Sequence, residues 1–235
     1  MRVLFIMDPI EGINIKKDTT FAFMLECQRR GWSVEYCLQT QLGAGQAGSW
    51  ATATPITVQA VVGDHVSAGE PTRRLLSEYG AIFMRTDPPV DMNYVYTTHL
   101  LEQVNDATIV VNRPADLRTA NEKTFILNFP DVIPTTIVTR KTPDIHQFLA
   151  DNGGRGIIKP LDRMGGSGIF MLRDDDPNLG SILETATDNG DELVMVQEYL
   201  PGAKEGDKRI LLMDGEPLGA VLRVPKGLAS TISTI

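Results

Sequence analysis

The stretch "IIKPLDRMGGSGIF", Ile157 to Phe170, carries the strongest structural signal in this chain. It begins as an apolar strand that ends near Lys159 and then passes through a turn with three glycines and one serine. Between Gly165 and Gly168 the only side chain is that of Ser167, so successive backbone N–H groups can approach an anion closely. With a cationic lysine at its base, such a turn suits a polyphosphate. Taken alone, Lys159 would be interpreted as a solvated strand terminus, and it is the glycine-rich turn that favours a phosphate contact.

The segments around this turn alternate between strands and helices. Strands are expected at 133–140, 156–160, 169–173 and 193–200. Helices are expected at 121–129, 142–154 and 177–187, and in the second of these Thr142 is the predicted cap and Pro143 the first helical residue. Residues 121–200 therefore predict a compact α+β domain. A hairpin with an Asp-Gly turn is expected within 210–224, so 201–235 is interpreted as the start of a further domain.

Residues 1–120 predict an open α/β domain with a parallel sheet. Buried strands are expected at 3–7, 33–38, 81–85 and 108–112, a loop or hairpin at 43–53, and helices at 18–31 and 92–103. Asp18 is the predicted cap of the first helix, and Gly31 is expected to end it. On the second helix, Met92, Val95, Tyr96, His99 and Leu100 recur at helical spacing.

Ligands of open α/β sheets bind at the carboxyl ends of the strands. Asp8, Arg85 and Asn112 each follow a predicted strand of the first domain. The first strand is not followed by G-x-G-x-x-G, and G-x-x-x-x-G-K-[ST] is absent from the sequence, so neither a dinucleotide fold nor a P-loop enzyme is predicted.

Composition narrows the classes of partner. The formal net charge of −8 and the pI near 4.9 argue against nucleic acid and anionic membranes, which attract basic surfaces. No apolar run approaches the length of a membrane-spanning helix, and the N-terminus becomes acidic too early for a signal peptide. The sequence thus predicts a cytoplasmic protein that binds small molecules or other proteins.

Cysteine and histidine do not form a recognisable site. Cys27 and Cys37 lack the paired spacings of zinc or redox motifs and are interpreted as reduced core thiols. His65, His99 and His146 lack metal-ligand spacing and are interpreted as solvated or packed imidazoles.

Two further segments could serve a nucleotide. Lys123 lies 36 residues before Lys159, because 159 − 123 = 36, and by itself is an exposed helix lysine. The strand that ends in Gln197, Glu198, Tyr199 and Leu200 could present its edge to adenine, although a plain sheet strand with a polar end fits equally well.

Six blocks in order resemble the bacterial glutathione synthetase family of the ATP-grasp superfamily across nearly the whole chain. They are "MDPI…INIKKDTTFAFMLECQRRGW", "FMRTDPP", "NRPADLRTANEKTF", "IIKPLDRMGGSGIF", "DPNLG" and "QEYLPGAKEGDKRILLMDGEP". The resemblance implies an ATP-grasp ligase that joins γ-glutamylcysteine to glycine through an acyl phosphate, using ATP and magnesium. It also implies a homo-oligomer, a tetramer as in the family.

The resemblance also implies roles for individual residues. The residues implied to bind ATP are Lys123, Lys159, Gly165, Gly166, Ser167, Gly168, Gln197, Glu198, Tyr199, Leu200 and Asp207. Asp8 and Arg85 are implied to bind substrate, Arg85 by neutralising a substrate carboxylate. Arg209 and Arg223 are implied to be catalytic, as weaker candidates for the same task.

The sequence departs from the family after "GEPLGAVLRVPKG", where "LASTISTI" replaces a glycine-rich segment. The family's magnesium ligands come from residues beyond this point, so we expect a chain without them and with the last part of the ATP-grasp fold missing. A shifted reading frame, a natural truncation and a deliberate shortening remain open as explanations. Another carboxylate–amine ligase of the superfamily and a non-catalytic ATP-binding module remain alternative functions.

Overall fold

The computed structural model describes residues 1–163, 166–213 and 215–224. The chain divides into two compact units, Met1–Ala120 and Asn121–Ile235. Among the described residues, no helix has the length and apolar character needed to cross a membrane.

The first unit contains an eight-stranded sheet in the order β3-β4-β2-β1-β7-β8, with β5 and β6 also paired to β4. Its strands are β1 Arg2–Ile6, β2 Ser33–Cys37, β3 Leu42–Gly45, β4 Gly48–Val58, β5 Val66–Ala68, β6 Thr72–Leu75, β7 Ala81–Met84 and β8 Ile109–Val111. The strands β2, β1, β7 and β8 run parallel, whereas β4 joins β2 antiparallel. The α/β class is confirmed, and 43–53 forms part of a hairpin, one of the two predicted possibilities.

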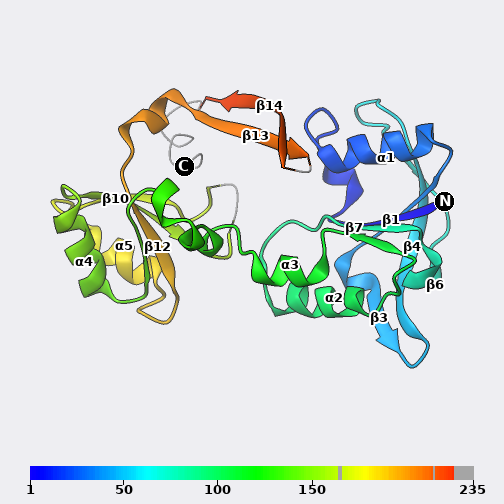
Figure 1. Cartoon of the computed structure of the whole chain (residues 1–235), viewed down its shortest axis with the longest axis horizontal. Helices are drawn as coiled ribbons and strands as arrows, with labels where there is room; N and C mark the ends of the chain where they lie inside the picture. The colour runs from blue at the N-terminus through cyan, green and yellow to red at the C-terminus, as the bar shows by residue number, and fades with distance from the viewer. Residues whose placement is uncertain (164–165, 214, 225–235) are drawn as a thin grey trace. The chain divides into compact units, whose positions relative to one another are not determined.

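Helices cover both faces of this sheet (Figure 1). Helix α1, Thr19–Arg29, packs on the face that carries Phe5, and α2, Met92–Glu102, packs on the face that carries Ile6. A short helix, α3 Pro114–Thr119, packs against α2. As predicted, Asp18 caps α1 by accepting a hydrogen bond from the Phe21 N–H at 2.7 Å.

The residues of α2 that recur at helical spacing do not form its buried face. Met92 is 57% exposed and Tyr96 is 59% exposed, whereas Leu101 is almost fully buried. The buried face also contains two threonines, whose hydroxyls donate to the helix carbonyls of Asn93 and Val95. Threonine can be buried there because its hydroxyl donates a hydrogen bond to a carbonyl of the same helix. A search for apolar periodicity does not detect such residues, because threonine is counted as polar.

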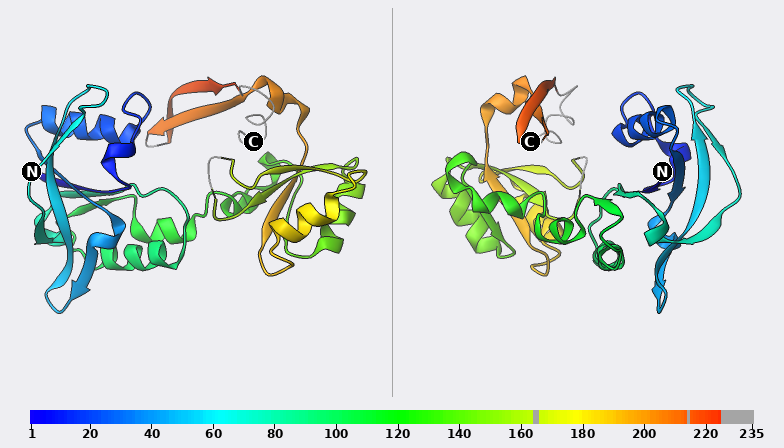
Figure 2. Two further views of the ribbon diagram at one scale, coloured as in Figure 1. Left: turned by 180° about the vertical axis from the view of Figure 1, so that it is seen from behind. Right: turned by 45° about the vertical axis from the view of Figure 1, so that its right-hand side comes forward.

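The second unit contains a four-stranded antiparallel sheet in the order β11-β10-β12-β9 and a separate hairpin. The strands of the sheet are β9 Thr136–Thr139, β10 Arg155–Pro160, β11 Phe170–Arg173 and β12 Val194–Glu198. Helices α4, Thr142–Asp151, and α5, Leu179–Ala186, cover one face of this sheet, where their apolar side chains pack on Ile158 and Val196 (Figure 2). The hairpin consists of β13 Asp207–Met213 and β14 Glu216–Arg223.

Two local predictions in this unit need correction. Thr142 is the first residue of α4 rather than its cap; the N-cap is Lys141, whose backbone N–H donates to the Thr139 hydroxyl. The segment predicted to be helical at 121–129 contains only a 3₁₀ helix, Thr124–Asn128. Tight 3₁₀ turns are common in connections of this length, because a full α-helix needs packing to be stable.

Candidate functional site

Lys159 lies inside β10 on the sheet face opposite α4 and α5. In the antiparallel register Lys159 pairs with Met195, and Ile157 pairs with Gln197, so these four side chains share one face. Lys159 is only 7% exposed and Gln197 only 5%. The Lys159 ammonium donates to Gln197 Oε1 at 2.7 Å. Among the described residues its one hydrogen-bond partner is uncharged, a costly arrangement for a buried cation that ligand binding can explain.

Lys123 lies in the same unit and close enough to act on Lys159. Its side chain is 13% exposed rather than solvated. Its ammonium donates at 2.6 Å both to Glu122 Oε1 and to the carbonyl oxygen of Arg163, in the loop that follows β10. The Asn121 side chain adds a contact to that loop by donating to the carbonyl oxygen of Leu161 at 3.3 Å.

The electrostatic environment lowers the pKa of Lys159 to about 8. Burial is the main cause, and the positive charge of Lys123 is the second. Two ammonium groups that repel each other in a partly dry setting would be stabilised by a polyanion.

The glycine-rich turn adjoins β10. Gly166 and Gly168 have φ values of 81° and 73°, which favour glycine. A Cβ atom at Gly168 would also lie 2.7 Å from Cγ of Pro160, so a side chain there would displace the end of the strand. Ser167 between them is exposed, and Gly165 lies outside the described residues.

The end of β12 is held to the start of β9. The Glu198 N–H donates to the carbonyl oxygen of Thr135 at 3.0 Å, and Glu198 Oε1 accepts from the Thr135 N–H at 3.3 Å. Tyr199 and Leu200 follow the strand, half-buried and exposed respectively. The Glu198 carboxylate thus already has a backbone partner in this structure.

The remaining predicted residues of this unit lie on the hairpin. Arg223 Nε donates to Asp207 Oδ2 at 2.8 Å, and its Nη2 contacts the same oxygen. Asp207 pairs with Arg223 in the register of β13 and β14, and Arg209 pairs with Val221. No recorded contact joins these three residues to Lys159 among the described parts of the chain.

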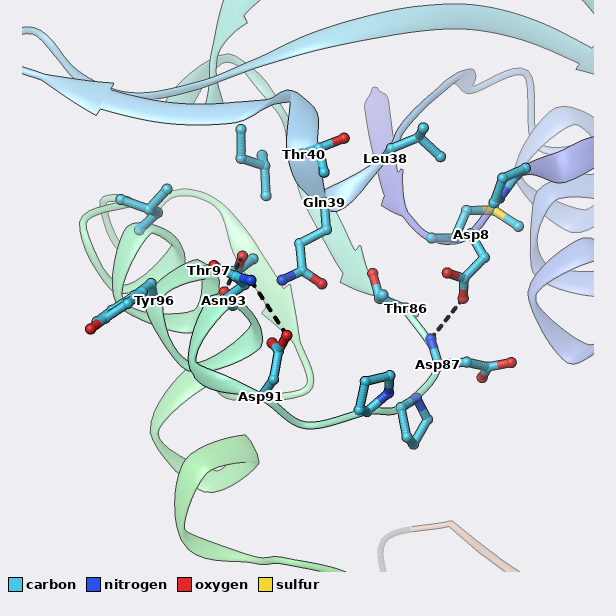
Figure 3. Close-up of a pocket in the computed structure, with 16 residues that line it drawn as sticks. Asp8, Leu38, Gln39, Thr40, Thr86, Asp87, Asp91, Asn93, Tyr96 and Thr97 are labelled. Atoms are coloured by element: carbon cyan, nitrogen blue, oxygen red, sulfur yellow. Dashed lines mark hydrogen bonds between the residues drawn. The ribbon is translucent and has the colours of Figure 1, made fainter. Parts of the chain in front are cut away.

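In the first unit, a pocket of about 630 Å³ lies at the carboxyl ends of β1, β2 and β7 (Figure 3). Asp8 lines it, and Asp8 Oδ2 accepts from the Asp87 N–H at 2.8 Å. Burial, with the Asp8 charge second, raises the pKa of Asp87. Asp91 also lines the pocket while capping α2 through the Tyr94 N–H. The pocket therefore carries a concentration of carboxylates, which suits a ligand with an amino group.

Two residues predicted at the strand ends do not line this pocket. Arg85 follows β7 as predicted, but its Nε donates to the Thr20 hydroxyl at 2.9 Å, at the start of α1. Asn112 follows β8 and is exposed. Asp8 is thus the only one of the three that lines the described pocket.

Sequence reasoning missed several lining residues, which come from the "TDPP" segment and from α2. "TDPP" was recognised only as the end of a strand, although a position after a parallel strand is itself a signal for a binding site. The lining residues from these two segments are Thr86, Asp87, Pro88, Pro89, Asn93, Tyr96, Thr97 and Leu100.

Comparisons with known proteins agree with this organisation. Residues 1–118 match the family "Prokaryotic glutathione synthetase, N-terminal domain", and residues 122–230 match "Prokaryotic glutathione synthetase, ATP-grasp domain". The chain is 43% identical over 222 residues to a glutathione synthetase of Vibrio vulnificus, covering 94% of this chain and 70% of that protein. It is 46% identical over 227 residues to a glutathione synthetase of Pseudomonas putida, covering 96% of this chain and 71% of that protein.

A solved structure supports the fold. An ATP-grasp RimK domain protein from Sphaerobacter thermophilus matches with a TM-score of 0.63 and 18% identity, covering 95% of this chain and 73% of that one. At this identity the likeness shows the fold alone, and it confirms the predicted ATP-grasp architecture. The two family matches cover most of the chain, and the predicted resemblance is confirmed: the chain belongs to the prokaryotic glutathione synthetase family, whose members are ATP-dependent ligases.

Proposed function

We propose that Lys123 and Lys159 bind the phosphates of ATP during the ligation of γ-glutamylcysteine to glycine. The observation that carries this proposal is the buried Lys159 ammonium, which bonds to the uncharged Gln197 in the described part of the chain and has a second cation nearby. Phosphoryl transfer depends mainly on positioning and charge neutralisation, which two converging ammonium groups supply.

The reaction proceeds in two displacements. A carboxylate oxygen of γ-glutamylcysteine attacks the γ-phosphorus of ATP. The bond between this phosphorus and the oxygen that bridges it to the β-phosphate breaks, and ADP leaves. The glycine amine then attacks the carbonyl carbon of the acyl phosphate, phosphate leaves, and the amine loses a proton as the amide forms. Because water would hydrolyse the acyl phosphate, Gly165 to Gly168 are proposed to cover it.

The other predicted residues keep the roles that the family resemblance implies. Gln197 to Leu200 are proposed to bind adenine, and Asp207 to lie near the nucleotide. Arg85 is proposed to neutralise a substrate carboxylate, and Arg209 and Arg223 are weaker candidates for the same task. Asp8 is proposed to bind the amino group of γ-glutamylcysteine in the carboxylate-lined pocket.

The described residues do not form a site for magnesium by themselves. No group of three or more His, Cys, Asp or Glu side chains within 1–163, 166–213 and 215–224 is arranged to hold a metal ion. No step is therefore assigned to the metal here. Magnesium as a cofactor, a homotetramer and a cytoplasmic location are further proposals that rest on membership of the family.

The test is Lys159→Ala. This change removes a buried charge that we assign to the phosphates, so ATP binding measured by calorimetry should weaken by about 100-fold or more. Lys141→Ala is the matched control, because Lys141 is an exposed lysine of the same unit that contributes only backbone contacts. Equal affinities for the two variants would refute the phosphate role.

A further inference from the structure

An unbroken series of hydrogen bonds connects Lys159 to the backbone before β9. The Lys159 ammonium donates to Gln197 Oε1 at 2.7 Å, and Gln197 Nε2 donates to the Thr136 hydroxyl oxygen at 2.9 Å. The Thr136 hydroxyl in turn donates to the carbonyl oxygen of Pro134 at 2.7 Å. The series crosses three strands, β10, β12 and β9, because Gln197 pairs directly with Thr136 in the sheet register.

The chemistry of the four groups fixes the direction of this series. An ammonium group has only donors, so Gln197 must turn its amide oxygen toward Lys159 and its amide nitrogen toward Thr136. The hydroxyl of Thr136 must then accept, and its proton is directed to a carbonyl oxygen, which has only acceptors. If the amide flipped, its donor nitrogen would face the ammonium group.

The surroundings make this orientation consequential. Gln197 and Lys159 are both nearly inaccessible to water, so an amide that lost its partner could not easily replace it with solvent. A chain of bonds that all point the same way also polarises each member in the same direction, which strengthens the contact to the cation. Because its proton is directed to Pro134, Thr136 accepts from the Gln197 amide nitrogen and so holds the amide in the orientation that Lys159 requires.

We propose that Thr136 is a positioning residue for ATP binding, which acts through Gln197 to hold the Lys159 ammonium in place. This inference rests on the proposed function, because the value of a positioned ammonium lies in its contact with phosphate. Thr136 itself is not proposed to touch the nucleotide.

The first test compares two valine variants. Thr136→Val keeps the size of the side chain but removes the hydroxyl, and ATP should bind about ten-fold more weakly, as expected when a buried amide loses one hydrogen-bond partner. Thr135→Val is the matched control, since Thr135 is exposed and only its backbone bonds to Glu198. Thr136→Ser restores the hydroxyl and should restore the affinity.

A double-mutant cycle separates positioning from a general structural role. In a Gln197→Ala background the series is already broken, so adding Thr136→Val should leave the ATP dissociation constant unchanged. If the two changes instead multiply each other's effects, Thr136 acts independently of Gln197 and the proposal is overturned. Matched urea unfolding curves for each variant show whether a loss of folding explains any change.

A titration tests the series without relying on ATP. Among the described residues, the charged group that acts on Lys159 is Lys123, which itself pairs with Glu122, and the partner of Lys159 on β12 is the uncharged Gln197. In an NMR titration, with the Lys159 signal assigned from its absence in Lys159→Arg, Thr136→Val should lower the pKa of Lys159 and Thr135→Val should leave it unchanged.

The experiments can refute the proposed function and the positioning role of Thr136 separately. If wild-type protein and Lys159→Ala bind ATP equally, the proposed function fails, whereas the titration still decides whether Thr136 controls Lys159. If ATP binds as proposed but Thr136→Val behaves as Thr135→Val in both measurements, the positioning role alone is refuted.

Discussion

At the scale of the residue, the protonation of Lys159 governs how the site responds to pH. Its pKa is about 8, lowered by burial and then by Lys123. The free protein therefore loses the ammonium as pH rises through this value, whereas an ordinary lysine would keep it. A phosphate group binds the charged form, so ATP affinity should be highest below the pKa and should decline above it.

This decline gives a measurable prediction. Between about pH 8 and about pH 9.5 the ATP dissociation constant should rise by at most about ten-fold per pH unit, the slope for uptake of one proton. Calorimetry at a series of pH values measures it. Lys159→Ala should give a flatter curve, and a wild-type curve without a bend near pH 8 would contradict the assignment.

Single residues also show where sequence reasoning stops. The spacing of Lys159 and the glycines was visible in the sequence, but the contact with Gln197 and Thr136 depends on antiparallel pairing across three strands. Glu35 was likewise unpredicted as a buried group. The Glu35 carboxylate accepts a hydrogen bond from the Tyr79 hydroxyl at 2.6 Å, and its Oε1 lies 3.1 Å from Arg2 Nε. Both partners are distant in sequence, and they offset the cost of burying the charge.

At the scale of the element, β2 shows what periodicity can decide. Val34 and Tyr36 alternate along β2 and share a face, but Cys37 on the other face is buried too, because helices cover both sides of the sheet. The strands β5 and β6 were not predicted, since they are short and mostly exposed and lack an apolar pattern. Strong apolar runs therefore predict the central strands. The short strands β5 and β6 form by pairing with β4, which their own sequences do not indicate.

The buried face of α2 predicts a contrast in stability. Leu101→Ala should lower the free energy of unfolding by about 2–4 kcal/mol, because it leaves a cavity beneath the helix. Met92→Ala should change it by less than about 0.5 kcal/mol, because Met92 is exposed. Urea unfolding followed by tryptophan fluorescence suits this test, since Trp32 and Trp50 are the two tryptophans of the sequence and both lie in the first unit. Equal losses of unfolding free energy in the two variants would show that Met92 is packed as closely as Leu101 and would contradict this assignment of the buried face.

At the scale of the whole molecule, the proposed ligands divide between the two units. The carboxylate-lined pocket belongs to Met1–Ala120, whereas Lys123, Lys159 and Gln197 belong to Asn121–Ile235. The sequence indicated this division because Asp8 follows a parallel strand, while the lysine and glycine signals lie in an antiparallel α+β region. The chain spans about 70% of the length of the Vibrio vulnificus and Pseudomonas putida proteins that it matches.

Hydrogen–deuterium exchange can test this division with each ligand in turn. ATP should slow exchange most strongly in peptides from β10 and β12, since their backbone and side chains supply the proposed phosphate and adenine contacts. γ-Glutamylcysteine should protect peptides that contain Asp8 and Asp87, which line the pocket. Lys159→Ala provides the control for ATP, because it should lose the protection of β10 while keeping that caused by the dipeptide. Protection by ATP that is confined to residues 1–120 would place the nucleotide elsewhere and refute the assignment of the second unit as its binding site.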